Sequence, residues 1–159
     1  MSFALRPRGE FSLAAAARFA EGFPGTIASS AGNELRFAWA VDDDWHTAEV
    51  SVRQTARTVT GRLRETPSEI AERAREDVER ILCLDVDGSG FGAIGERDPV
   101  VGALQRRYPG LRPVLFYTPY EAAAWAIIGH RIRMTQAAAI RERLADEIGS
   151  RGAFPGPTS

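Results

Sequence analysis

The segment from residue 98 to residue 149 constrains the fold most, because capping and helix-breaking residues mark the ends of its helices. Asp98 followed by Pro99 predicts the start of a helix, and Pro109 predicts that this helix ends at Tyr108. An aspartate in that position accepts hydrogen bonds from the free N–H groups of a first turn, whereas proline cannot continue a helix. This part of the chain is therefore expected to consist of helices alone.

Two further helices are predicted beyond residue 117, with a short turn between them as the tip of a helical hairpin. Thr118 and Glu121 form a capping box before the first helix, which is apolar on nearly all sides and is therefore expected to be buried on most of them. The second helix is predicted from Thr135 to Gly149. Its outer face is expected to carry Arg141, Glu142 and Arg143. The turn spans Gly129–Arg133.

Residues 1–84 predict an antiparallel sheet with two helices, which makes the fold class α+β. A short strand is expected at Phe3–Leu5, and one helix after the N-cap Ser12. The strand residues expected to face the core are Leu35, Phe37, Trp39, Val41, Val50, Val52, Val59 and Leu63. Those expected to face water are Arg36, Arg53, Arg62 and Arg64. A second helix, capped by Ser68, should cover the sheet with Ile70, Ala74, Val78 and Ile81.

A glycine-rich run, residues 85–97, separates the sheet region from the helices and is expected to be a flexible connection. Alternating Asp85, Asp87 and Ser89 resemble half of a calcium loop, but the residues after Gly90 offer few ligands, so the connection is favoured. The predicted organisation is an N-terminal α+β domain at 1–84, the connection at 85–97, a helical segment at 98–149 and a flexible tail at 150–159.

The composition excludes several classes of function. All 20 basic residues are arginine, so no lysine can form the Schiff base of a lyase. Residues 97–143 hold eight arginines and three acidic residues, a net charge of +5 in a chain whose total is −1. A single cysteine, Cys83, allows no internal disulfide, which favours a reducing compartment and a cytoplasmic location. No apolar run approaches the roughly 20 residues of a membrane span.

We expect neither a metal nor a cofactor. The two histidines, His46 and His130, are isolated from each other in the sequence, which disfavours a metal role for either. Trp45 and His46 are expected at the surface of a hairpin turn.

One long segment resembles the region that joins the N-terminal and helical domains in the 3-methyladenine DNA glycosylase II family, of the helix-hairpin-helix superfamily. It reads DPVVGALQRRYPGLRPVLFYTPYEAAAWAIIGHRI and is preceded by LDVDGSGFG. The resemblance extends more loosely to the N-terminal third. It implies that residues 1–84 are similar to half of the TATA-binding fold and that the helices after them begin an incomplete glycosylase domain.

The resemblance also implies base excision repair of double-stranded DNA by base flipping. Such enzymes extrude an alkylated base such as 3-methyladenine and hydrolyse its glycosidic bond. Gly129, His130 and Arg131 match a turn of the family, with His130 in place of the usual polar amide. The side chain at the position of Arg131 fills the gap left in the base stack. Arg133 adds a second cation for DNA binding. From composition alone, a solvated turn is the alternative interpretation.

By the same resemblance, Phe19 aligns with an aromatic residue of the flipped-base pocket. The negative face of its ring would attract an electron-deficient alkylated base. Burial of Phe19 against the sheet is the alternative, and core packing is the expected role of Trp125.

No catalytic residue is expected in this chain, because the family's catalytic aspartate and helix-hairpin-helix element follow the matched segment. Asp146 and Glu147 belong to the last turn of a helix, most of a helix length from the hairpin tip. We therefore expect the N-terminal portion of a DNA glycosylase, inactive alone.

A different class of function is the alternative: a non-catalytic DNA-binding or dimerising interaction module. An uncovered hairpin would expose an apolar patch made of Trp125, Ile127, Ile128, Ile140 and Leu144. A homodimer would cover such a patch. A small α+β ligand-binding regulator is a third interpretation, for which the sequence identifies no ligand.

Overall fold

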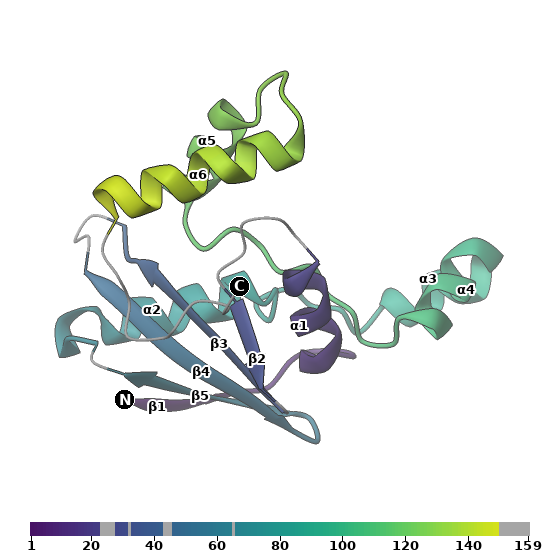
Figure 1. Cartoon of the computed structure of the whole chain (residues 1–159). Helices are drawn as coiled ribbons and strands as arrows, with labels where there is room; N and C mark the ends of the chain where they lie inside the picture. The colour runs from purple at the N-terminus through teal and green to yellow at the C-terminus, as the bar shows by residue number, and fades with distance from the viewer. Residues whose placement is uncertain (23–27, 32, 43–45, 65, 150–159) are drawn as a thin grey trace.

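The computed structural model describes residues 1–22, 28–31, 33–42, 46–64 and 66–149 (Figure 1). The elements of this part of the chain are β1 Ser2–Leu5, α1 Leu13–Glu21, β2 Ala28–Ala31, β3 Glu34–Ala40, β4 Thr47–Thr55, β5 Thr58–Arg64, α2 Ser68–Ile81, α3 Phe91–Arg97, α4 Pro99–Arg107, α5 Pro119–Ile128 and α6 Met134–Ile148. The strands precede most of the helices, and the predicted α+β class is confirmed.

The strands form one antiparallel sheet in the order β1-β5-β4-β3-β2. Strands β2 to β5 pair with their neighbours in sequence, and β1 joins the free edge of β5 with Phe3 opposite Gly61. Strand β2 is not predicted from the sequence, because its residues ASSA show no apolar alternation. The likeness to half of the TATA-binding fold stays a prediction.

One face of the sheet and helix α2 together build the core. The strand residues predicted to face inward are all buried: Leu35, Phe37, Trp39, Val41, Val50, Val52, Val59 and Leu63. The predicted stripe of α2 is buried with them: Ile70, Ala74, Val78 and Ile81. The Trp39 Nε1 atom donates a hydrogen bond to Asp77 Oδ2 at 3.1 Å, so the indole N–H is paired. Each such apolar side chain contributes about 1.5 to 3 kcal/mol when fully buried, which makes this layer the main source of stability.

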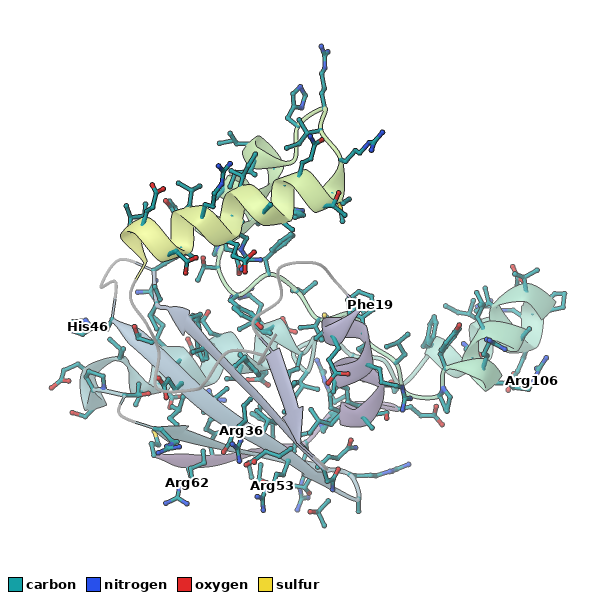
Figure 2. All side chains as sticks on the ribbon, in the orientation of Figure 1. Phe19, Arg36, His46, Arg53, Arg62 and Arg106 are labelled. Carbon is teal, nitrogen blue, oxygen red and sulfur yellow. The ribbon has the colours of Figure 1, made fainter. Side chains whose placement is uncertain are left out.

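The opposite face of the sheet is polar, as the alternation predicts. Arg53, Arg62 and Arg64 are exposed and Arg36 is half-buried, and Figure 2 shows the three labelled arginines of this face gathered at one side of the molecule. Glu34 lies among them and forms ion pairs with Arg36 at 2.5 Å and with Arg53 at 3.3 Å. One face of the sheet therefore packs in the core, and the other face is exposed to solvent.

Side-chain caps begin three of the helices where the sequence predicts them. Ser12, Asp98 and Thr118 each accept a hydrogen bond from a backbone N–H two or three residues later, at 3.2, 2.8 and 3.1 Å. Each cap contributes about 1 kcal/mol. The prediction that Ser68 caps α2 is wrong by one residue. Ser68 is already helical, because Pro67 has the extended backbone of the N-cap position and makes no side-chain bond there.

The expected connection between residues 85 and 97 contains a helix, α3, which the sequence analysis missed. Its glycines suggested irregular structure, but Gly95 instead lets α3 cross α4 in close contact. A Cβ atom placed on Gly102 would lie 2.6 Å from the Gly95 carbonyl oxygen, too close for any side chain. Backbone contact between the two helices therefore needs glycine on both. The proposed domain boundaries stay a prediction.

Helix α5 is not buried on most sides, so that expectation is wrong. None of its residues is buried, and Ile127 is 77% exposed. The helix packs on α6, and Glu121 at its start accepts a hydrogen bond from Tyr117 N in the segment before it. Arg141 of α6, expected on the outer face, is instead half-buried in an ion pair with Glu121 of α5. Apolar composition predicted burial, but it could not say whether a covering element exists.

The side chain of Arg112 joins the segment before α1 to the segment between α2 and α3. It is only 8% exposed and donates to four backbone carbonyl oxygens, those of Arg8, Glu10, Cys83 and Val86. These acceptors lie before α1 and between α2 and α3. The segment that follows Arg112 leads past α1 to the α5–α6 hairpin, so this side chain fixes the path of the chain into the hairpin (Figure 1).

Candidate nucleic-acid interface

The turn Gly129–Arg133 lies at the tip of the α5–α6 hairpin, on the side of the molecule away from the sheet (Figure 1). His130, Arg131 and Arg133 are all exposed. The backbone of Arg131 has φ +58°, in the left-handed region that non-glycine residues rarely adopt. Two hydrogen bonds that continue α5 hold the start of the turn, from Gly129 N to Trp125 O at 2.8 Å and from His130 N to Ile127 O at 3.3 Å. The tip is thus an ordered, solvent-facing bend.

The charge of this tip is positive. The five turn residues include two arginines and no acidic residue. The carboxylates of α6 come later in the helix, at Glu142, Asp146 and Glu147. The tip therefore presents cations to solvent with no carboxylate inside the turn to compete for them.

Phe19 lies at the end of α1 nearest the hairpin, as Figure 2 shows. Its side chain is 41% exposed, so it is not buried against the sheet. It lines a cavity of about 170 Å³ whose other lining residues are Ala20, Val114, Leu115, Phe116, Tyr117, Glu121 and Arg141. The structure therefore brings one predicted site residue to a cavity formed by α1, the chain before α5, and both helices of the hairpin.

The cavity has one polar side, formed by an ion pair. Arg141 Nη2 donates to Glu121 Oε1, and each of these side chains is 21% exposed. The other carboxylate oxygen, Glu121 Oε2, accepts the backbone N–H of Tyr117 at 2.9 Å. Both oxygens of this carboxylate are thus hydrogen-bonded inside the protein.

The wall formed by residues 114–117 is held in place by α2. Arg80 donates to the carbonyl oxygen of Phe116 at 3.1 Å and also to that of Tyr117. Leu115 N donates to Ile81 O at 2.9 Å. The cavity is therefore built on the rigid core, although its opposite wall comes from the more exposed hairpin.

Tyr117 connects this wall to the core. Its ring stacks on the ring of Phe37 with the centroids 5.3 Å apart, and Tyr117 as a whole is only 6% exposed. The hydroxyl is buried with no hydrogen-bond partner in the described part of the chain. Burial raises the pKa of this hydroxyl well above the ordinary tyrosine value, and the nearby Glu121 carboxylate adds to the shift. The group therefore stays protonated and uncharged at neutral pH.

The raised pKa predicts a loss of stability in alkali. Above pH about 10, the ordinary pKa of tyrosine, the unfolded chain releases the Tyr117 proton while the folded chain keeps it. The free energy of unfolding should then fall with rising pH. Urea unfolding measures this free energy at neutral and at alkaline pH. Between the two, it should fall less in Tyr117→Phe than in the native chain, while the substitution should change the stability little at neutral pH. Tyr120→Phe, at a tyrosine that is 62% exposed, is the control, and equal falls in both variants would contradict the prediction.

The cavity and the turn are separated by part of one helix. Glu121 and Arg141 each lie about eight residues from the tip of the hairpin. At 1.5 Å of rise per residue this is about 12 Å along the helix axes. This distance corresponds to about three to four base-pair steps of 3.4 Å along a duplex.

Other residues singled out in the sequence lie elsewhere. His46 is exposed, Trp45 falls outside the described residues, and Trp125 is half-buried without lining the cavity. Asp146 and Glu147 are exposed on the last turns of α6. Among the residues that the structure describes, no cluster of His, Cys, Asp or Glu could hold a metal.

Cys83 does not have the properties of a nucleophile. Burial raises the pKa of its thiol, and the neighbouring Asp85 carboxylate raises it further. The reactive form of cysteine is the thiolate, which this environment disfavours.

The sequence analysis missed Tyr117, Glu121 and Arg141 as parts of a site. Thr118 caps the helix as predicted, but the predicted capping box is only half formed, because Glu121 Oε2 accepts the N–H of Tyr117 and not that of Thr118. The approach of Arg141 to Glu121 joins residues 20 positions apart through the packing of the hairpin. No local pattern signals such a contact.

Comparisons with known proteins support the fold. No family model and no curated protein matches the sequence. Among solved structures, the chain is similar to the 3-methyladenine DNA-glycosylase from Archaeoglobus fulgidus, with a TM-score of 0.75 and 16% identity, covering 97% of this chain and 53% of that chain. It is also matched to a structure described as MBOgg1 in complex with low affinity DNA ligand, with a TM-score of 0.49 and 16% identity, covering 81% and 51% of the two chains.

The similarity to the first of these structures shows that the chain has the fold of part of a DNA glycosylase. The chain spans about half the length of the solved structures that it matches. At this identity the likeness concerns the fold alone. None of the described helices is long and apolar enough to cross a membrane.

Proposed function

We propose that this chain binds double-stranded DNA and flips a damaged base out of the stack, in the manner of the 3-methyladenine DNA glycosylases. The observation that carries the proposal is the exposed arginine turn at the tip of the hairpin, with an aromatic-lined cavity about eight residues away along the same two helices. The fold of a DNA glycosylase supports it.

In this proposal Arg131 enters the gap that the flipped base leaves. A guanidinium group is planar, stacks on bases and keeps its charge beside phosphates, so it suits this position. Arg133 contacts the phosphate backbone, and His130 follows Gly129 at the edge of the turn. The left-handed backbone of Arg131 supports a functional role, because strained conformations concentrate at such sites.

Phe19 stacks on the flipped base in the cavity. An exposed aromatic face at the mouth of an apolar cavity is the arrangement that base-flipping enzymes use to hold an extruded ring. Residues Val114 to Tyr117 form another wall of this cavity.

We further propose that this chain alone does not cleave the glycosidic bond. Glu121 is the one carboxylate that lines the cavity in the described part of the chain, and both of its oxygens are engaged. A carboxylate that stabilises an oxocarbenium-like sugar must face that sugar. Chromatography of alkylated duplex DNA after incubation with the chain should show no released base. Release that persists in Asp146→Asn and Glu147→Gln would overturn this part of the proposal.

Binding to DNA with an abasic site tests the proposal as a whole. Flipping costs a few kcal/mol of stacking and pairing in an intact duplex, and much of that cost is absent where the base is already missing. We expect the chain to bind an abasic duplex at least about tenfold more tightly than an intact one, which is 1.4 kcal/mol. Fluorescence anisotropy at low salt measures both affinities. Equal affinities, or no binding, would contradict the proposal.

One observation favours the interaction module as a second candidate. Helix α5 is apolar and has no buried residue, with Ile127 77% exposed, and an apolar helix without a cover favours a contact site. A homodimer formed through this surface would appear in light scattering. A tight dimer with no affinity for duplex DNA would replace the proposed function with this one.

A further inference from the structure

One polar group in the lining of the cavity beside Phe19 has no partner. Among the lining side chains in the described part of the chain, only Tyr117 buries a polar atom that makes no hydrogen bond. The two charged side chains of the lining, Glu121 and Arg141, bond to each other. The great majority of buried polar groups in proteins are paired, because an unpaired one costs stability. The Tyr117 hydroxyl is therefore an exception that has a physical cause.

The fold does not need this hydroxyl. Tyr117 contributes to the core through its ring, which stacks on the ring of Phe37. A phenylalanine ring would make the same contact, whereas the hydroxyl adds only the cost of its lost water. Residues that lower stability in this way occur where function requires them. A bound molecule that supplies the missing partner would account for a tyrosine at this position.

The Tyr117 hydroxyl lies close to the charged side of the cavity. Burial has the largest effect on its pKa and raises it. The Glu121 carboxylate raises this pKa further and the Arg141 guanidinium lowers it, so both charges of the cavity lining act on the hydroxyl. Because the raised pKa keeps the proton in place at neutral pH, the group is available as a hydrogen-bond donor.

Tyr117 is fixed before any ligand enters. Arg80 donates a hydrogen bond to the carbonyl oxygen of Tyr117, and the N–H of Tyr117 donates to Glu121 Oε2. The stacking on Phe37 holds the ring. A donor that is already in place loses little conformational freedom when it binds, so more of the energy of its hydrogen bond appears as affinity.

We propose that the Tyr117 hydroxyl faces the cavity and donates a hydrogen bond to an acceptor atom, a ring nitrogen or a carbonyl oxygen, on the edge of the flipped base. The inference rests on the proposed function and adds a specificity-determining residue to it. Phe19 contacts the face of the base, and Tyr117 contacts its edge. The ligand is a planar heterocycle with an acceptor on that edge, whether or not the ring carries a positive charge elsewhere.

The size and the lining of the cavity suit such a ring. Its volume is about 170 Å³, and an apolar protein cavity of about 150 Å³ holds one benzene molecule. The remaining walls are apolar: Ala20, Val114, Leu115 and Phe116. In a site of this kind a few polar groups fix the orientation of the ligand. The hydroxyl of Tyr117 therefore decides which edge of the ring turns inward.

Two free heterocycles of nearly the same shape test the proposal without DNA. Benzimidazole has a ring nitrogen that accepts a hydrogen bond, indole has a carbon at that position, and both are uncharged at neutral pH. In Tyr117→Phe the affinity for benzimidazole should fall at least about fivefold, and the affinity for indole should change by less than about twofold. NMR titrations of the full chain measure both affinities. Tyr120→Phe, at an exposed tyrosine outside the cavity lining, is the control and should match the native chain.

A direct readout of the hydroxyl comes from NMR of the chain labelled with the NMR-active carbon isotope at the Cζ atoms of its tyrosines, because the Cζ shift responds to hydrogen bonding of the hydroxyl. The chain has three tyrosines. Tyr108→Phe and Tyr120→Phe, both at exposed positions, identify the Tyr117 signal by elimination. Saturation with benzimidazole should move this signal clearly more than saturation with indole. A purely structural role of Tyr117 gives equal movements.

Three results of the titrations would overturn the inference: unchanged affinity for benzimidazole in Tyr117→Phe, equal losses of affinity for the two heterocycles, or no binding of either one to the native chain. If Tyr117→Phe does not fold, the Cζ signal of the native chain decides, and equal movements with the two heterocycles would overturn the inference.

The proposed function is judged separately by binding to abasic DNA. A chain that binds abasic DNA and shows no contact of Tyr117 with benzimidazole refutes only the role of the hydroxyl. A chain that binds benzimidazole through Tyr117 and does not bind DNA refutes only the DNA-binding function.

Discussion

Replacing Arg131 and Arg133 together with alanine is expected to weaken duplex DNA binding by at least about tenfold at low salt and to lower the slope of log affinity against log salt by about 1. An arginine that neutralises a phosphate releases about one condensed counterion, so the loss of Arg133 from the phosphate backbone removes about one unit of the slope. Both side chains are exposed at the hairpin tip, and neither makes a side-chain hydrogen bond in the described part of the chain. Their loss should therefore leave the fold intact.

Anisotropy titrations over a range of salt concentrations measure both quantities. Arg62→Ala is the matched control, because Arg62 is an exposed arginine on the sheet face, far from the hairpin in Figure 2. An equal loss of affinity in Arg62→Ala would show that DNA binding depends on the net charge of the protein and not on the turn. Unchanged binding in the double variant would mean that the turn is a solvated loop that does not contact DNA.

Arg131→Gly separates the function of this side chain from its structural cost. The left-handed backbone at φ +58° costs a non-glycine residue roughly 1 to 2 kcal/mol. Glycine relieves that strain, although it adds entropy to the unfolded chain. We therefore expect a variant that is no less stable than the native chain and yet binds DNA more weakly.

Replacing Arg112 with alanine is expected to lower the free energy of unfolding by about 3 to 5 kcal/mol. The four carbonyl oxygens that Arg112 holds would lose charge-assisted hydrogen bonds, each worth about 1.5 to 3 kcal/mol when counted singly and less in combination. Against a total stability of about 5 to 15 kcal/mol for a native protein, this is a large fraction.

Urea unfolding measures the effect, with Arg62→Ala as a surface control that should change stability by less than about 0.5 kcal/mol. Arg112→Lys should recover only part of the loss, because an ammonium group cannot reproduce the fork of guanidinium donors. A loss below about 1 kcal/mol in Arg112→Ala would mean that water replaces the guanidinium at these carbonyls.

Local signals predicted the starts of α1, α4 and α5 and the inward-facing strand residues, because each depends on neighbours in the sequence. Asp98 and Thr118 cap helices within two or three residues, and the alternation from Leu35 to Val41 follows from the strand period. Such signals also placed the turn Gly129–Arg133 correctly at an exposed tip.

Properties that depend on distant packing could not be predicted in this way. Helix α5 was expected to be buried on most sides because it is apolar, yet none of its residues is buried and Ile127 is 77% exposed. Helix α3 was missed because its glycines suggested a connection, whereas Gly95 allows backbone contact with Gly102. The cavity brings Phe19 and Arg141 together across most of the chain, and only the folded structure shows this.

The central claim is that the arginine turn enters the DNA stack, and the fluorescence of 2-aminopurine placed in a duplex tests it most directly. This base is quenched while stacked and brightens when it is unstacked. Saturation with the native chain is predicted to raise the fluorescence, and saturation with Arg131→Ala to raise it much less. If the native chain binds the duplex fully and the fluorescence stays at its stacked level, the turn does not open the helix and the account is contradicted.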